Sequence, residues 1–209
     1  MRYPLVLLAA GLVAAVAAPA QAESAEAGRP LYVVCASCHG ADAGGNPAQG
    51  APRLNHLAPV YLSTQLEKFR SGLRGGESDS PRAQAMAAMA KSLPDDQALY
   101  AVSDYIASLD SPVSPVTVSG DSGLGGDYYR QLCGACHGAD AMGNKALHSP
   151  RLAGSDDWYL ESQLHAFREG SRGSTPADLN GRQMRAMAAT LPDDQAVRDV
   201  VSYLRSLAK

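Results

Sequence analysis

Residues 35–39 are Cys35-Ala36-Ser37-Cys38-His39, and residues 133–137 are Cys133-Gly134-Ala135-Cys136-His137. Both stretches match C-x-x-C-H, the attachment motif of c-type haem. On one turn of a helix, cysteines three residues apart present their sulfurs to the same side, where both can add to the vinyl groups of one haem. The next histidine then lies under the iron and supplies the proximal nitrogen ligand. The motifs therefore predict two covalently attached haem c groups, with six residues as attachment sites and proximal ligands: Cys35, Cys38, Cys133, Cys136, His39 and His137.

Paired cysteines also occur in zinc sites and in redox-active dithiols. The chain has four cysteines, and all of them lie in the two motifs. A zinc ribbon would use the four together and would leave the histidine after each pair without a purpose. A thioredoxin-like dithiol requires a βαβ pattern nearby, and the sequence has none. The haem interpretation is therefore favoured.

The first 22 residues have the features of a secretory signal peptide. Arg2 supplies the positive charge, residues 5–18 form an apolar run, and Ala20-Gln21-Ala22 is a small-x-small cleavage site. The apolar run of about 14 residues is shorter than the roughly 20 that span a membrane, which disfavours an uncleaved anchor. We expect a mature periplasmic protein that begins at Glu23 and has no transmembrane segment.

The composition limits both the partners and the core. Eighteen Lys and Arg against 21 Asp and Glu give a net charge of −3. Nucleic acid is therefore not expected as a partner, because binding to phosphates requires a basic surface. Two Phe and one Trp give small domains a thin aromatic core. A buried porphyrin would supply the missing apolar bulk.

The chain contains an internal repeat, in which each residue from Cys35 to Leu109 aligns without a gap with its counterpart 98 positions later. Pro52-Arg53-Leu54, for example, is repeated as Pro150-Arg151-Leu152. The segment between the copies is rich in Ser, Pro, Gly and Val and has no helical period, as expected for a linker. We predict a first domain at residues 23–109, a linker at 110–121 and a second domain at 122–209.

Each copy has the apolar spacing of a few helices. The predicted helices of the first copy cover 28–38, 59–71 and 95–109, and apolar residues recur at helical spacing in the second and third. The second copy repeats the pattern, with its first helix at 126–136. We expect Gly28 and Gly126 to lie where the first helix of each copy crosses the last. No segment alternates with a two-residue period, so the predicted fold class is all-α.

This order of features resembles class I cytochrome c: a helix, C-x-x-C-H, a proline-bearing loop, a middle helix, a methionine loop and a C-terminal helix. Two such domains in tandem resemble the dihaem cytochrome c4 family. The likeness covers about residues 25–207, and its most specific motifs are the duplicated C-x-x-C-H-G, P-R-L and Y-L-x-x-Q-L-x-x-F-R-x-G segments. In that family the residue after the loop proline is often lysine, and here it is Arg53 or Arg151, a mild departure.

Two methionines in each copy compete for the second axial position, in which a thioether raises the potential of the iron. The pairs are Met86 with Met89, and Met184 with Met187. The resemblance implies that the ligand lies seven residues before the leucine that precedes the last helix, which assigns Met86 and Met184. Met89 and Met187 are then expected to pack on the haem.

Three further histidines could compete with methionine as distal ligands. They are His56, His148 and His165, and none has a histidine as its counterpart. A duplicated site should use a duplicated ligand. We therefore expect these three to be surface or loop residues.

The resemblance also implies supporting residues around each haem. The carbonyls of Pro52 and Pro150 would accept a hydrogen bond from the proximal histidines, although both could be ordinary turn prolines. Arginine and tyrosine side chains would hold the haem propionates, with solvated arginines and core tyrosines as the alternatives. These residues are Arg53, Arg151, Tyr61 and Tyr159.

Three functions are compatible with two haem-binding repeats. A soluble electron carrier would take one electron per haem from a quinol-oxidising complex or a periplasmic dehydrogenase and pass it to a terminal oxidase or reductase. The dihaem subunit of a periplasmic dehydrogenase, such as a flavin sulfide dehydrogenase or an alcohol dehydrogenase, would have nearly the same sequence. A dihaem enzyme would need an open iron position on one haem, but Met86 and Met184 are both present. We expect a carrier without enzymatic activity whose partners are redox proteins, and the dehydrogenase subunit is the alternative.

Overall fold

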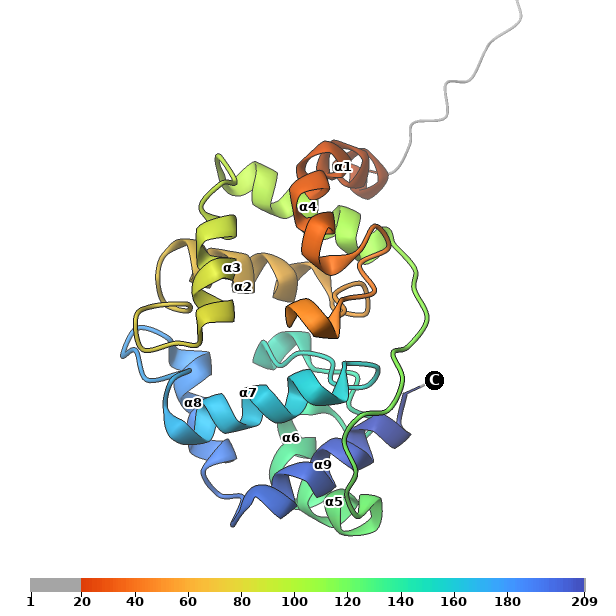
Figure 1. Ribbon diagram of the computed structural model, residues 1–209, viewed down its shortest axis with the longest axis vertical. Helices are drawn as coiled ribbons and strands as arrows, with labels where there is room; N and C mark the ends of the chain where they lie inside the picture. The colour runs from red at the N-terminus through yellow and green to blue at the C-terminus, as the bar shows by residue number, and fades with distance from the viewer. Residues whose placement is uncertain (1–19, 209) are drawn as a thin grey trace, which may run out of the picture.

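The computed structural model describes residues 20–208 of the chain, and within that range it is helical without a β-strand, as predicted. The first half contains α1 (Ala20–His39), the 3-10 turn η1 (Pro47–Gln49), α2 (Pro59–Arg70), α3 (Pro81–Ala90) and α4 (Asp96–Ser108). The second half contains α5 (Ser122–Tyr128), the π-helix η2 (Tyr129–Cys133), α6 (Gly134–His137), the 3-10 turn η3 (Lys145–Leu147), α7 (Asp157–Glu169), α8 (Leu179–Ala188) and α9 (Asp194–Ser206). The two halves are stacked along the long axis, so that α2 and α3 face α7 and α8 across the middle (Figure 1).

The ends of the helices follow from local sequence. Asp95 and Asp193 are the N-cap residues of α4 and α9, and each carboxylate accepts a hydrogen bond of 2.8 Å from a backbone N–H of the first turn. Proline occupies the first position of α2 and of α3, where its missing N–H costs no helical hydrogen bond. The duplicated Leu-Pro-Asp-Asp segment therefore starts a helix in each half, as the sequence predicts.

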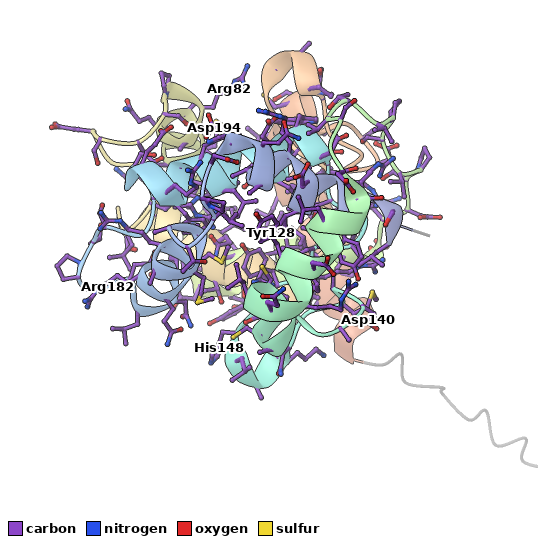
Figure 2. The ribbon with its side chains drawn as sticks, turned by 90° about the horizontal axis from the view of Figure 1, so that it is seen from below. Arg82, Tyr128, Asp140, His148, Arg182 and Asp194 are labelled. Atoms are coloured by element: carbon purple, nitrogen blue, oxygen red, sulfur yellow. The ribbon has the colours of Figure 1, made fainter. Side chains whose placement is uncertain are left out.

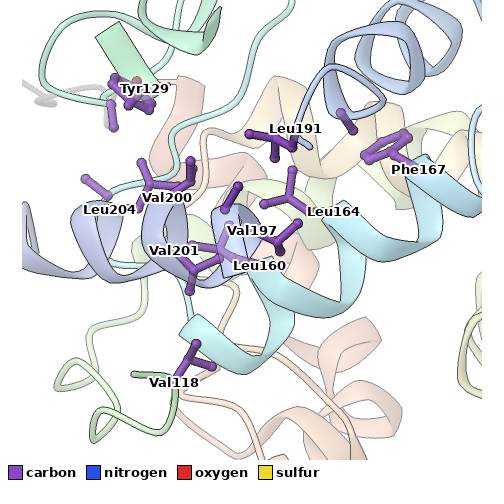
Figure 3. Packing of buried hydrophobic residues seen from close by; sticks show 14 residues of the cluster. Val118, Tyr129, Leu160, Leu164, Phe167, Leu191, Val197, Val200, Val201 and Leu204 are labelled. Atoms are coloured by element: carbon purple, nitrogen blue, oxygen red, sulfur yellow. The ribbon is translucent and has the colours of Figure 1, made fainter. Parts of the chain in front are cut away.

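Each half encloses its own hydrophobic core. In the second half, Val197, Val200 and Leu204 of α9 are at most 2% exposed and pack against Leu160 and Leu164 of α7 (Figure 3). The first half has the corresponding cluster between α2 and α4. Two separate cores agree with the two tandem units of the repeat.

The first helix crosses the last helix of its own half at a glycine. A Cβ atom on Gly28 would lie 2.0 Å from the carbonyl oxygen of Ala101, so only glycine permits this approach of α1 to α4. In the second half the equivalent approach is made by Gly125, where a Cβ atom would lie 1.9 Å from the Asp199 oxygen. Gly126 packs against Tyr203 of α9, as expected, with ring carbons 3.1 Å from where its Cβ atom would lie, but the closest backbone approach is shifted by one residue to Gly125.

An inserted residue causes this shift. Tyr32 precedes Cys35 by three positions, whereas Tyr129 precedes Cys133 by four. The helix of the second half absorbs the extra residue in the π-helix η2, because a π-helical turn holds one residue more than an α-helical turn. Both tyrosine hydroxyls consequently donate 2.7 Å hydrogen bonds to the same carbonyl of the motif, that of Gly40 or Gly138.

The segment between α4 and α5 is held against both halves. Arg53 donates to the hydroxyl and the carbonyl of Ser111 at its start. Asp157 accepts from the backbone N–H groups of Thr117 and Val118 further along, at 2.6 and 2.9 Å. The linker is therefore docked along its length on one side of the molecule (Figure 1).

Most of the predicted signal peptide, residues 1–22, lies outside the described residues, which begin at Ala20 within α1. Among residues 20–208, no helix combines the length and the apolar character that a membrane span requires.

Candidate haem sites

The two proximal histidines are oriented by the same hydrogen bond. His39 ends α1 and His137 ends α6, and each is 7% exposed. The Nδ1 atoms lie 2.8 Å from the carbonyl oxygen of Pro52 and 2.9 Å from that of Pro150. Because a carbonyl only accepts, Nδ1 carries the proton and donates, which leaves Nε2 with the free lone pair that a metal ligand needs. The structure thus contains the proline contacts that the resemblance implies.

A glycine brings the proline segment to the histidine. Gly45 has a φ of 87°, and its N–H donates to the His39 carbonyl at 2.9 Å. A Cβ atom at Gly45 would lie 2.6 Å from the backbone nitrogen of Arg53. Gly143 repeats this arrangement beside His137, with a φ of 84°. Positive φ and the lack of a side chain are both needed for the loop to close over the histidine.

The two cysteines of each motif differ in exposure. Cys38 and Cys136 are exposed, whereas Cys35 and Cys133 are half-buried. A zinc ribbon would require the four sulfurs to converge, but residues 20–208 contain no cluster of three or more His, Cys, Asp or Glu side chains that could hold a metal ion.

The resemblance implies that the methionines lie in a loop, and this is wrong, because they lie on helices. Met86 and Met89 belong to α3, and Met184 and Met187 belong to α8. Met86 and Met184 are partly buried and pack against the core of their own half. Met89 and Met187 are 38% and 37% exposed. This difference favours Met86 and Met184 as the inward-facing sulfurs, and their role as ligands stays a prediction.

The arginines after the two loop prolines have different partners. Arg53 is 8% exposed and donates to Ser111 and to the Gly154 carbonyl of the other half, with Nη1 to oxygen 3.0 Å. Arg151 donates within its own loop, to the Ala153 carbonyl at 2.8 Å. Three of the five donors of Arg53 are thus used, two to hold the linker at Ser111 and one to reach the other half at Gly154. Propionate binding by either arginine stays a prediction.

Comparison with known proteins agrees with this geometry. The family model for cytochrome c matches the chain twice, over residues 25–110 and 124–208. This chain belongs to the cytochrome c family. It is 34% identical to the thiosulfate dehydrogenase electron acceptor of Stutzerimonas stutzeri (strain A1501), over 86% of this chain and 82% of that protein. It is 30% identical to cytochrome c4 of Azotobacter vinelandii, over 89% of this chain and 90% of that protein.

A solved structure is similar over the same range. Thiosulfate dehydrogenase (TsdBA) of Marichromatium purpuratum superimposes with a TM-score of 0.68 and 34% identity, over 86% of this cytochrome and 39% of that chain. This cytochrome therefore corresponds to a minor part of the length of that longer protein. The two C-x-x-C-H motifs in tandem cytochrome c domains carry two covalently attached haem c groups, which makes the chain a dihaem electron-transfer protein.

A network around one buried and one half-buried arginine lies at the interface between the domains, and no sequence motif predicted it. Arg74, which is 8% exposed, donates to Gln65 and, in the other domain, to Gln163 and Tyr159 at 2.8 Å each. Arg172 donates to the same two glutamines, at 2.6 Å to Gln163 and 3.0 Å to Gln65. Arg74 and Arg172 are counterparts in the repeat, and this was the signal that could have revealed them.

The interface suits a cofactor that carries carboxylates. Two guanidinium groups are brought together there, and the hydrogen-bond acceptors named above are all neutral oxygens. Buried charges normally have a partner of opposite sign, and a haem brings two propionates. Tyr159 is one of the predicted propionate residues, and here its hydroxyl accepts from Arg74, while Tyr61 is half-buried on α2. The haem itself supplies an iron that gains and loses one electron.

The three remaining histidines lie in different surroundings. His148 is exposed at the periphery, on the loop that also carries Asp140 (Figure 2). His165 lies on α7, with Nδ1 3.7 Å from the Asp194 carboxylate. His56 is in a loop, as expected, but that loop enters the domain interface, where Nε2 lies 2.7 Å from the Ser155 hydroxyl. Burial and the charges of Arg53 and Arg151 lower the pKa of His56 to about 3, so it is neutral.

Proposed function

We propose that this cytochrome is a periplasmic carrier of single electrons between a quinol-oxidising complex or a dehydrogenase and a terminal oxidase or reductase. One observation carries the proposal: the two sites are built alike. Each has a histidine whose Nε2 is free, a proline carbonyl that fixes the ring, and an inward-facing methionine. We propose Met86 and Met184 as the second axial ligands, which would leave neither iron a position for substrate.

The domain limits of the proposal are residues 23–109 and 122–209, with the linker at 110–121. The observed gap between Ser108, which ends α4, and Ser122, which starts α5, supports these limits. Export and cleavage before Glu23 are supported by the signal-peptide features of the sequence.

Carbon monoxide binding and a redox titration test the closed state of both irons. The fully reduced holoprotein is expected to give no change in its visible spectrum under carbon monoxide, because both axial positions are filled. The titration should resolve two one-electron steps, and the intact mass should show two haem additions. Binding of carbon monoxide to either haem of the undamaged protein would contradict a simple carrier and would indicate catalysis.

A second candidate is a dedicated electron acceptor of a dehydrogenase. The similarity to a thiosulfate dehydrogenase electron acceptor and to part of a thiosulfate dehydrogenase supports it. The two candidates differ in the donor. Stopped-flow reduction by a thiosulfate dehydrogenase with thiosulfate should be fast and saturable for a dedicated acceptor. If the protein is a general carrier, the thiosulfate dehydrogenase should reduce it no faster than an unrelated donor of equal potential does.

A further inference from the structure

One buried ion pair joins the two domains at the start of a methionine-bearing helix. Lys68 lies on α2, and its Nζ atom is 2.6 Å from Oδ1 of Asp178, with side chains 13% and 5% exposed. The same Oδ1 atom accepts the N–H of Gly181 at 3.0 Å as the N-cap of α8. A single carboxylate oxygen thus connects α2 of the first domain to the first turn of α8 in the second, and these helices face each other in Figure 1.

The other methionine-bearing helix has no equivalent connection. The counterpart of Lys68 is Ala166, and the counterpart of Asp178 is Ser80. Ser80 is exposed, and its hydroxyl accepts from Ala83 N at 3.3 Å, so α3 is capped within its own domain. Among the ion pairs of residues 20–208, the one between Lys68 and Asp178 crosses the domain interface and the others stay within one domain.

Helix α8 also has a glycine that makes room for the carboxylate. A Cβ atom on Gly181 would lie 2.1 Å from Oδ2 of Asp178 and 2.5 Å from its Cγ, which is a severe overlap. The counterpart in α3 is Ala83, a much better helix former than glycine. The second domain therefore has a weaker first turn that is compatible with an aspartate reaching Lys68. Three positions differ together between the repeats, and all three belong to this contact.

We propose that Lys68 and Asp178 are a positioning pair that makes methionine ligation at the second haem depend on docking of the two domains. The inference rests on the proposed assignment of Met184, which lies on α8. Removing one partner of a buried ion pair leaves the other charge without compensation, so α8 should loosen when the pair is broken. Helix α3 and Met86 should not respond, because their cap is local.

The test uses the full-length holoprotein and exchanges residues between the repeats. Lys68→Ala and Asp178→Ser each install the residue that the other repeat has, and the second substitution keeps a capping side chain. Lys68→Arg retains the charge as the conservative variant. Ser80→Ala is the matched control, since it removes the local cap of α3 and leaves the cross-domain pair intact.

Hydrogen exchange of the backbone amides gives the first readout. Lys68→Ala and Asp178→Ser are each expected to speed exchange in α8 by about tenfold or more while α3 is unchanged. The double variant should be no worse than the more affected single variant, because both remove the same contact. Lys68→Arg should exchange like the wild type, and Ser80→Ala should affect α3 only. Equal changes in α3 and α8, or no change in α8, would overturn the positioning role.

The sulfur-to-iron absorption band of the oxidised protein gives the second readout. In Lys68→Ala and Asp178→Ser, about half of the band should disappear at a lower urea concentration than in the wild type. The rest of the band comes from the first haem and should disappear at the same urea concentration as in the wild type. Met184→Ala checks the ligand separately, because it should remove half of the band without urea. If Met184→Ala leaves the band intact, the assignment of Met184 is wrong and the ligation part of the proposal fails with it. The hydrogen exchange of α8 would still decide whether Lys68 and Asp178 position that helix.

Discussion

The tautomer of each proximal histidine is decided by one carbonyl. Because the carbonyls of Pro52 and Pro150 accept a hydrogen bond from Nδ1–H, the Nε2 lone pairs of His39 and His137 are directed away from the proline loops. Burial lowers the pKa of both histidines, although the carbonyl contact opposes that shift. Burial therefore favours the neutral ring, and the carbonyl decides which nitrogen keeps the proton, so that Nε2 can bind a metal.

At the residue scale, the methionine assignment is the sharpest prediction. Met86→Ala should lower the potential of one haem by on the order of 0.1 V, because a thioether favours the ferrous state. It should also remove about half of the sulfur-to-iron band and allow carbon monoxide to bind at that haem. Spectroelectrochemistry of the purified variant measures all three effects.

Met89→Ala is the control on the same helix. Its side chain is 38% exposed, so we expect the band and both potentials to stay close to those of the wild type. A lost band in Met89→Ala together with an intact band in Met86→Ala would reverse the assignment.

At the scale of single elements, the π-helix η2 shows how the fold tolerates an insertion. Gly125 and Tyr129 keep the contacts that Gly28 and Tyr32 make in the first domain, and the extra residue is confined to the turn before Cys133. The contacts at both ends of the helix are conserved between the domains, while the helical geometry between them differs.

Deleting Gln131 should convert this segment to a regular α-helix. The variant is expected to keep both haems and to change the free energy of unfolding by less than about 1 kcal/mol, because Gln131 is exposed and the flanking contacts are retained. Intact mass and urea unfolding measure both effects.

Deleting Val33 from the first domain is the contrasting case, since α1 has no π-helical turn to absorb the change. It should cost about 3 kcal/mol or more by moving Tyr32 out of register.

The linker depends on Asp157. Burial disfavours ionisation of this carboxyl, but the N–H groups of Thr117 and Val118 and the Thr117 hydroxyl hold its pKa below the ordinary value. Its stabilising effect is therefore present above the ordinary pKa of aspartate and is lost as the pH falls through the folded value.

Asp157→Ala should destabilise the protein by about 3 kcal/mol, because it leaves the buried N–H of Val118 and the neighbouring donors without a partner. Thermal or urea unfolding at neutral pH measures the loss. Asp127→Ala removes an exposed carboxylate of a surface ion pair and should cost less than about 0.5 kcal/mol. Similar losses in the two variants would show that the linker contacts contribute little.

At the scale of the whole molecule, the two domains form one interface whose polar contacts include a neutral histidine. His56 contacts the Ser155 hydroxyl, and burial together with the charges of Arg53 and Arg151 lowers its pKa to about 3, below its ordinary value near 6.5. The unfolded chain therefore binds a proton that the folded protein does not. The full stability is present above the ordinary pKa of histidine and decreases as the pH falls below it.

Acidification from pH 7 to pH 5 should thus cost up to about 2 kcal/mol through His56. His56→Asn removes the titrating group and should flatten the pH dependence of the unfolding free energy in this window. His148→Asn, at an exposed loop position with a φ of 53°, should retain the wild-type dependence. Parallel curves for the wild type and His56→Asn would show that His56 does not titrate on unfolding.

The sequence by itself determined the number of domains, their helical class and the haem motifs. All of these depend on short spacings or on the repeat, which local geometry enforces. It did not determine that the methionines lie on helices, that Gly125 makes the closest backbone approach at the crossing, or that Arg53, His56 and Arg74 meet the other domain. Those depend on which surfaces the two domains bury against each other. Those surfaces are selected by the complementary shape and charge of residues far apart in the chain, which cannot be predicted from local spacing.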